Sequence, residues 1–291
     1  SCELAVKMAR KYWFEKGYHD KFEIITFEGS FHGRSSAGIA ATASEKMTKG
    51  FGPLLPGFLS INWNNHEAIK NSISDRTAAI LLEPIQGEGG IRVVPEQCLK
   101  GIREFCDENK ILLILDEVQC GVGRTGKLFA HEWAEIEPDI MMVAKGIGGG
   151  FPLGAVLAKE NAASGMTTGT HGSTYGGNPL GCSIGLKVMD IISNPNFLLD
   201  VNHKAKNFRA GLSELLNKNT SIFEEVRGKG LMLGLKCKVQ NIDVVNAGYS
   251  KKLLTVPAGD NVVRLLPPLT ISDKEIKQAL EKLDCVMTEL S

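Results

Sequence analysis

Three short apolar runs in this chain each lead into an ionisable side chain. The runs are residues 77–82 before Glu83, residues 111–115 before Asp116, and residues 140–144 before Lys145. Continuous apolar runs of this length are typical of parallel strands that are buried on both faces of a sheet. Functional groups gather beyond the carboxyl ends of such strands. Because core packing does not explain ionisable residues at three strand ends, we expect them to lie at one functional site.

The remaining pattern predicts an α/β fold in two parts. Amphipathic stretches at residues 3–15 and 95–109 predict helices between the strands. After residue 194 the rhythm changes to a long polar helix, several short strands and a final helix. We therefore expect a large domain over residues 1–194, with a mainly parallel sheet covered by helices on both faces, and a smaller α+β domain over residues 195–291.

Charge and cysteine content argue against several classes of protein. The 33 Lys and Arg residues balance 33 Asp and Glu residues, whereas a nucleic-acid or anionic-membrane partner calls for a basic surplus. No apolar run approaches the ~18 residues of a membrane span. The seven cysteines are widely spaced without a CxxC pair, and the six histidines form no HxxxH pattern. We therefore expect no disulfide framework, no metal site and a reducing, cytoplasmic compartment.

Lys145 and Asp116 are the residues best suited to chemistry. Lys145 leaves an apolar run and precedes the glycine-rich segment 146–150, so we expect partial desolvation, which favours a neutral, nucleophilic amine. Asp116 needs a cation or several donors, and the protonated ring nitrogen of a cofactor would serve. The ordinary interpretations stay open: a lysine whose head group reaches water, and a carboxylate that pairs with an arginine such as Arg124.

Two glycine-rich segments could bind phosphate groups. Residues 121–126 match the GxGxxG pattern of dinucleotide sites, but they do not lie directly at a strand-to-helix turn, so a simple turn is the better interpretation. Residues 171–178 combine hydroxyl groups and glycines before Pro179, which opens an apolar helix. This second segment predicts a phosphate site or, equally, a flexible loop that caps the helix.

Two arginines could bind a dicarboxylate through forked hydrogen bonds. Arg34 lies in a polar turn after a strand, and Arg264 lies between apolar residues of a short strand. A guanidinium in the second position needs a carboxylate partner, for which Glu88 is a candidate. For either arginine alone, a structural ion pair is the commoner explanation.

Together these segments resemble the class III aminotransferases of the pyridoxal-phosphate-dependent fold type I, over essentially the whole chain. The resemblance is strongest at residues 30–34 (SFHGR), 83–90 (EPIQGEGG), 115–121 (LDEVQCG), 145–150 (KGIGGG) and 171–179 (HGSTYGGNP). It implies pyridoxal 5′-phosphate as the cofactor and a homodimer with shared active sites. The expected substrates are amino acids and 2-oxo acids.

The resemblance also implies a role for individual residues. Lys145 would bond covalently to the cofactor, and Asp116 would pair with its ring nitrogen. The other residues expected at the cofactor are Phe31, Glu117, Val118, Gln119 and, across the dimer interface, Thr174.

The resemblance implies substrate contacts as well. Arg34 would bind the substrate carboxylate remote from the reacting amine, with Ser173 nearby. Arg264 would bind the α-carboxylate of glutamate, and Glu88 would pair with Arg264 when glutamate is absent. The motif variants favour N2-acetylornithine as amino donor and 2-oxoglutarate as acceptor. Ornithine, succinylated diamines and 4-aminobutyrate stay open as donors, and so does an inactive binding module.

The first residues depart from the family pattern. Family members carry a longer segment at the start of the first large helix, and Ser1-Cys2-Glu3 matches only its last three positions. We expect that the N-terminal part of the large domain, about a quarter of the usual chain, is missing. The missing backbone amides help to hold the cofactor phosphate, so we expect weakened cofactor binding.

Overall fold

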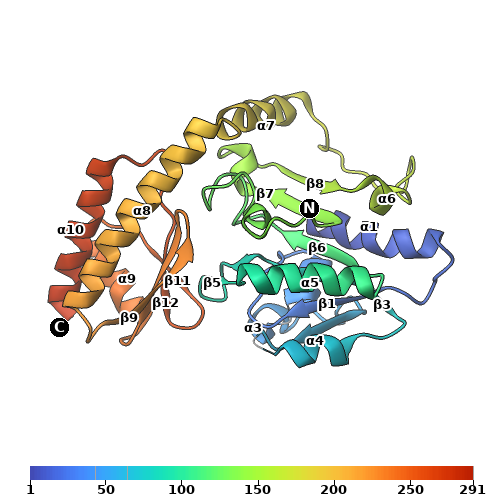
Figure 1. The fold of residues 1–291 in the computed structure, drawn as a ribbon, viewed down its shortest axis with the longest axis horizontal. Coiled ribbons are helices and arrows are strands. Elements are labelled where there is room, and N and C mark those ends of the chain that lie inside the picture. Colours follow the sequence, from blue (N-terminus) through green and yellow to red (C-terminus); the bar gives the residue numbers. More distant parts are fainter. Residues whose placement is uncertain (43, 64, 291) are drawn as a thin grey trace. The chain divides into compact units, whose positions relative to one another are not determined.

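The computed structural model describes residues 1–42, 44–63 and 65–290, which form two compact units (Figure 1). The first unit comprises Ser1–Pro84, Val94–Val122 and His131–Asp190. The second comprises Ile85–Val93, Gly123–Ala130 and the chain from Ile191 onward.

The first unit contains a six-stranded sheet in the order β2-β1-β3-β6-β7-β8. Its strands are β1 (Glu23–Phe27), β2 (Phe58–Ile61), β3 (Thr77–Leu82), β6 (Leu112–Asp116), β7 (Ile140–Ala144) and β8 (Gly154–Ala158). All neighbours pair in parallel except β7 and β8, which are antiparallel. Leu115 is in register with Leu82 on β3 and with Met141 on β7, so the carboxyl ends of these three strands lie side by side.

Helices cover both faces of this sheet, as the apolar runs predict. Alternate residues of β3 point to opposite faces, with Leu81 in one hydrophobic cluster and Leu82 in the other. The first cluster includes residues of α1, α2 and α6, and the second includes residues of α4 and α5. The helices are α1 (Cys2–Glu15), α2 (Ser36–Thr42), α3 (Glu45–Thr48), α4 (His66–Ser72), α5 (Glu96–Glu108), α6 (Glu160–Ala163) and α7 (Pro179–Ile192), with short 3₁₀ turns η1 (Ala130–Ala134) and η2 (Lys145–Gly148).

The second unit is built on a four-stranded antiparallel sheet in the order β11-β12-β10-β9. Its elements are α8 (Pro195–Lys218), β9 (Phe223–Lys229), β10 (Met232–Cys237), α9 (Asn241–Ser250), β11 (Val256–Ala258), β12 (Val262–Leu265) and α10 (Asp273–Leu290). A two-stranded ribbon of β4 (Ile85–Gln86) and β5 (Arg92–Val93) joins it, and β5 contacts β9.

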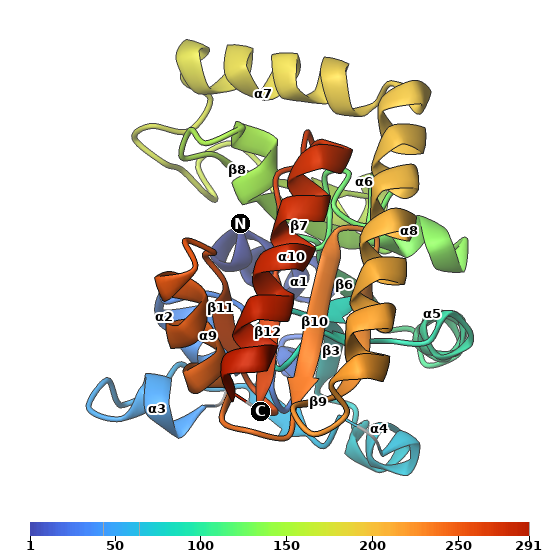
Figure 2. The same cartoon turned by 90° about the vertical axis from the view of Figure 1, so that its left-hand side faces the viewer.

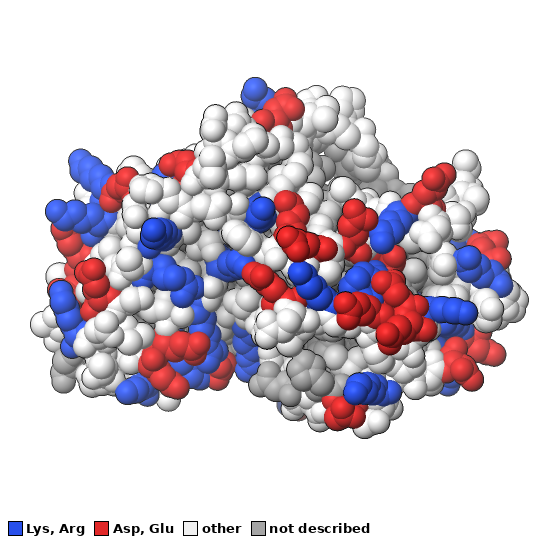
Figure 3. All heavy atoms as spheres, in the orientation of Figure 1, with Lys and Arg blue, Asp and Glu red and all other residues white. Residues whose placement is uncertain are grey.

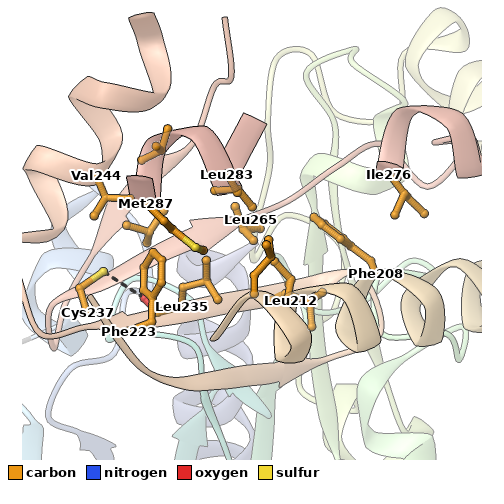
Figure 4. Packing of buried hydrophobic residues seen from close by; sticks show 14 of the residues in the cluster. Phe208, Leu212, Phe223, Leu235, Cys237, Val244, Leu265, Ile276, Leu283 and Met287 are labelled. Atoms are coloured by element: carbon orange, nitrogen blue, oxygen red, sulfur yellow. Dashed lines mark hydrogen bonds between the residues drawn. The ribbon is translucent and has the colours of Figure 1, made fainter. Parts of the chain in front are cut away.

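Helices α8 and α10 pack side by side on this sheet (Figure 2). Figure 4 shows how Phe208 and Leu212 of α8 meet Leu283 and Met287 of α10 over Leu235 of β10. Local signals fix the helix starts. The Asn194 side chain accepts a hydrogen bond from the Asn196 amide just before α8, and Ser272 forms a reciprocal capping box with Glu275 at the start of α10. The result is a small α+β unit with its own core.

The surface carries charges of both signs in close alternation, as Figure 3 shows for one face. This agrees with the zero net charge of the sequence. Within the described ranges, no helix combines the length and the apolar composition that a membrane crossing requires.

Candidate active site

A cavity of about 250 Å³ lies at the carboxyl ends of β3, β6 and β7 in the first unit. Glu83, Asp116 and Lys145 all line it, so the sheet brings together the three ionisable residues that follow the apolar runs. Strand register is the cause, because adjacent parallel strands that end within a few residues of the same level present their next residues to the same space.

The carboxylate of Asp116 is buried and held by two donors. Its Oδ2 lies 2.8 Å from Nδ1 of His32, and its Oδ1 accepts a hydrogen bond of 3.1 Å from the backbone amide of Val118. Nε2 of His32 is also buried and has no hydrogen-bond partner among the described residues. His32 was not among the residues expected at the site, although it lies between Phe31 and Arg34, which both were. A histidine within a motif of functional residues was the available signal.

Glu83 holds the backbone of Phe31 at the cavity. It is 3% exposed, and its Oε2 accepts a hydrogen bond of 3.0 Å from the amide of Phe31. Phe31 thereby lines the cavity. The guanidinium carbon of Arg34 lies 5.7 Å from the centre of the Phe31 ring, and the Arg34 side chain is exposed.

Lys145 lies where β7 passes into η2, in a backbone conformation that is unusual for a lysine. Its φ of 47° falls in the left-handed region, which costs a non-glycine residue about 1 kcal/mol. Such strain is found mainly at functional sites. The expected desolvation is wrong for this chain, because the 3₁₀ turn carries Lys145 beyond the buried strand and leaves it exposed at the cavity.

The turn after β6 presents some of its side chains to the cavity and turns others away. Val118 and Gln119 line the cavity, as expected. Glu117 is not among the lining residues. It is fully buried, and its Oε1 accepts a hydrogen bond of 2.8 Å from the His131 amide and lies 3.0 Å from Nδ1 of the same residue. Glu117 therefore anchors the turn that follows Asp116.

The GxGxxG segment forms a chain of turns, as the simple interpretation predicts. A Cβ on Gly121 would lie 2.6 Å from the Glu117 carbonyl oxygen, so only glycine fits this turn. Arg124 does not serve Asp116. Its Nη1 donates to the carbonyls of Leu231 and Pro267 in the second unit, and burial lowers its pKa to about 10.

The hydroxyl-rich segment before α7 is exposed. Ser173 and Thr174 both lie at the surface of the single chain and are not lining residues of the cavity. Asn178 caps α7, because its Oδ1 accepts a hydrogen bond of 2.8 Å from the Gly181 amide, and Pro179 is the first helical residue.

In the second unit, the expected pair of Arg264 and Glu88 is present. Nη1 of Arg264 lies 2.6 Å from Oε1 of Glu88. Arg264 is only 7% exposed, so a guanidinium that would otherwise be a costly buried charge has a carboxylate partner.

The donor set of the cavity fits pyridoxal 5′-phosphate. Lys145 offers a primary amine for an aldehyde, Asp116 a fixed buried carboxylate for a protonated ring nitrogen, and Phe31 a flat apolar surface for a ring. In the described part of the chain, no group of three or more His, Cys, Asp or Glu residues is arranged to hold a metal ion.

Comparison with known proteins identifies the protein family. The family model described as "Aminotransferase class-III" matches residues 1–287, and the chain belongs to this family of fold type I enzymes. Its members use pyridoxal 5′-phosphate and transfer amino groups between amino acids and 2-oxo acids.

Named relatives narrow the comparison. The chain is 61% identical over 290 residues to the acetylornithine aminotransferase of Rhodobacter capsulatus, covering 100% of this chain and 74% of that protein. Among solved structures, an ornithine aminotransferase from Toxoplasma gondii superimposes with a TM-score of 0.93 at 31% identity, covering 99% of this chain and 70% of that one. The N-acetylornithine aminotransferase of Stenotrophomonas maltophilia gives 0.84 at 35% identity, covering 99% and 72%.

Proposed function

We propose that this chain acts as an acetylornithine aminotransferase. It would move the δ-amino group of N2-acetyl-L-ornithine to 2-oxoglutarate, giving N-acetylglutamate 5-semialdehyde and L-glutamate, a step of arginine biosynthesis. The observation that carries this proposal is the 61% identity to the Rhodobacter enzyme across the whole chain. The cavity with Lys145 and Asp116 supports the same chemistry.

Six residues of the first unit would hold the cofactor. Asp116 would face the ring nitrogen, and Phe31 and Val118 would contact the ring. Gln119 would lie near the ring's oxygen substituent, and Lys145 would reach the reactive carbon. Thr174 would bind the phosphate group of the cofactor that a partner subunit holds. When bound, pyridoxal phosphate supplies an electron sink for the negative charge that develops on the substrate carbon.

The residues of the chain do the positioning and the proton transfer. His32 and the Val118 amide hold the Asp116 carboxylate in one orientation, so that it can keep the ring nitrogen protonated. The Nζ atom of Lys145 is the base that would take a proton from the carbon bearing the substrate amine. Because Lys145 is exposed at the cavity, its amine has room to move between the carbon that bears the substrate amine and the reactive carbon of the cofactor.

The proposed reaction uses two substrates of different shape. Glutamate reacts at an amine beside its carboxylate, and Arg264 would bind that group. N-acetylornithine reacts at the far end of its chain, and Arg34 would bind its carboxylate. Glu88 would neutralise Arg264 in that half of the reaction. Two unit charges 4 Å apart interact by about 4 kcal/mol at an effective dielectric constant of 20, which is enough to affect the choice of substrate.

A homodimer in the cytoplasm is part of the proposal. Tyr175 is 82% exposed, and Leu180 and Leu186 of α7 are 60% and 68% exposed, which is unusual for large apolar side chains grouped on one segment. Thr174 belongs to the same segment, so an interface there would bring it to a partner's cofactor. The seven cysteines are all free thiols, which fits a reducing compartment.

Steady-state kinetics test the proposal. We expect kcat/KM with 2-oxoglutarate to be at least about tenfold higher for N-acetylornithine than for ornithine or 4-aminobutyrate, because a site that forms hydrogen bonds to the N-acetyl amide rejects donors that lack this group. The Toxoplasma structure makes ornithine the main rival donor. A preference for free ornithine would contradict the proposal.

A further inference from the structure

The loop that carries Glu88 is fixed to the rest of the second unit at several points. The Gly259 amide donates a hydrogen bond of 2.7 Å to the Glu88 carbonyl oxygen. A Cβ on Gly90 would lie 2.6 Å from the Gly259 carbonyl oxygen, so the two backbones approach as closely as glycine allows. Nη1 of Arg227 donates to the Gly90 carbonyl oxygen at 3.3 Å.

The buried side chain of Ile91 anchors the same loop. It is fully buried, and its φ of 51° is in the left-handed region, which is rare for a β-branched residue. Two glycines of the sheet make room for it. A Cβ on Gly228 would lie 3.0 Å from Ile91 Cγ2, and a Cβ on Gly234 would lie 3.0 Å from Ile91 Cγ1. Strain of this kind persists only where the surroundings dictate the conformation, so the packing around Ile91 holds this end of the loop in place.

Asp260 connects this loop to the turn between β11 and β12. Its Oδ2 lies 2.6 Å from Nη1 of Arg227, the atom that also reaches Gly90. Its second carboxylate oxygen accepts a hydrogen bond from Lys236. Loss of the Asp260 charge would therefore loosen Arg227 and, through it, the Glu88 loop.

We propose that Ile91 and the Arg227–Asp260 pair are positioning residues that set how readily Glu88 yields Arg264 to the α-carboxylate of a dicarboxylic amino acid. Arg264 is buried and always needs a carboxylate, so Glu88 and the substrate compete for it. A fixed loop raises the effective concentration of Glu88 at Arg264, and a loosened loop lowers it. This inference rests on the proposed function, in which the Glu88–Arg264 pair selects between substrates.

Two matched variants separate positioning from general stability. Asp260→Asn removes the charge, and asparagine accepts the left-handed φ of 52° at this position. Glu225→Gln is the control, because Glu225 pairs with the same arginine at Nε, 2.7 Å away, rather than at the Nη1 that reaches Gly90. Arg227→Lys serves in place of Asp260→Asn if that variant does not fold, since lysine keeps the charge but cannot bridge Asp260 and Gly90.

The measurements are the Kd of glutarate for the holoenzyme, by calorimetry, and the ratio of kcat/KM for glutamate to that for N-acetylornithine. We expect Asp260→Asn to bind glutarate about fivefold more tightly, the effect of one weakened hydrogen bond, and to shift the ratio toward glutamate by a similar factor. Glu225→Gln should stay within about twofold. Glu88→Gln should change both quantities more than Asp260→Asn does. The double variant should behave like Glu88→Gln alone, because both substitutions act through the Glu88 carboxylate.

The possible outcomes test the positioning role and the proposed function separately. If Glu88→Gln shifts glutarate binding but Asp260→Asn behaves like Glu225→Gln, the positioning role is wrong. If Glu88→Gln shifts nothing, Glu88 does not compete for Arg264 and the inference is also wrong. A wild-type enzyme that binds glutarate but does not turn over N-acetylornithine would contradict the proposed function alone, because glutarate binding requires no turnover.

Discussion

The imidazole Nδ1 of His32 lies 2.8 Å from Oδ2 of Asp116, and both side chains are almost completely buried at the cavity. The pair joins residues 84 positions apart, from the loop after β1 and the end of β6. Together with the Val118 amide, His32 leaves the Asp116 carboxylate little freedom to rotate. Orientation of this carboxylate is what a cofactor with a protonated ring nitrogen requires.

Replacement of His32 by alanine should weaken cofactor binding. We expect the Kd for pyridoxal phosphate to rise about fivefold or more, because the Asp116 carboxylate loses a donor worth about 1 kcal/mol. Spectroscopic titration of the apoenzyme measures this. The control is His131→Ala, which removes an imidazole outside the cavity but keeps the backbone amide that anchors Glu117, so the Kd should be nearly unchanged. Equal effects of the two substitutions would argue against a specific role for His32.

The left-handed backbone of Lys145 should lower the stability of the fold. In denaturant titrations of the apoenzyme, the free energy of unfolding of Lys145→Gly should exceed that of Lys145→Ala by about 1 kcal/mol. The reason is that glycine adopts the φ of 47° without strain. Both variants should lack the visible absorbance of the bound cofactor, since both lack the amine. An alanine variant as stable as the glycine variant would show that the backbone of Lys145 is unstrained.

Asp260 should make the stability of the second unit depend on pH. Burial raises the pKa of this carboxyl, but hydrogen bonds from Lys236 and Arg227 outweigh burial and leave the pKa below its usual range. Its stabilisation is therefore present above about pH 4, the pKa in the unfolded chain, and is lost as the pH falls through the lower folded value. The difference in unfolding free energy between wild type and Asp260→Asn should shrink between pH 6 and pH 3. A constant difference would contradict this.

The ion pair of Arg103 and Asp139 should matter for stability. Both side chains are nearly buried and lie 2.8 Å apart, and Asp139 also accepts a hydrogen bond from the Leu113 amide on β6. Arg103→Met should cost about 3 kcal/mol, because it removes the nearer of two cations from a mostly buried carboxylate and leaves Lys159, 3.7 Å away, as the remaining one. Lys70→Met, which breaks an exposed ion pair with Glu67, should cost less than about 1 kcal/mol in the same denaturation experiment. Similar losses would refute the distinction.

The sheet and the ionisable cluster could be predicted because they depend on local patterns. Apolar runs of strand length identify β3, β6 and β7, and topology alone then brings Glu83, Asp116 and Lys145 together. The antiparallel sheet and long helices of the second unit follow from similar signals.

What the sequence could not predict depends on contacts between distant residues. The orientation of Glu117 toward His131 follows from packing of the turn after β6, which no periodicity encodes. The left-handed conformation of Ile91 follows from two glycines that lie more than a hundred residues away. Exposure of Lys145 depends on a short 3₁₀ turn that glycines permit but do not require.

The central claim is that the cavity around Lys145 and Asp116 transfers the amino group of N-acetylornithine. A half-reaction tests it most directly: holoenzyme is mixed with N-acetylornithine alone, and the cofactor absorbance is followed in a stopped-flow instrument. We predict that the visible band disappears, and that 2-oxoglutarate restores it. A band that ornithine abolishes while N-acetylornithine leaves it unchanged would contradict the account.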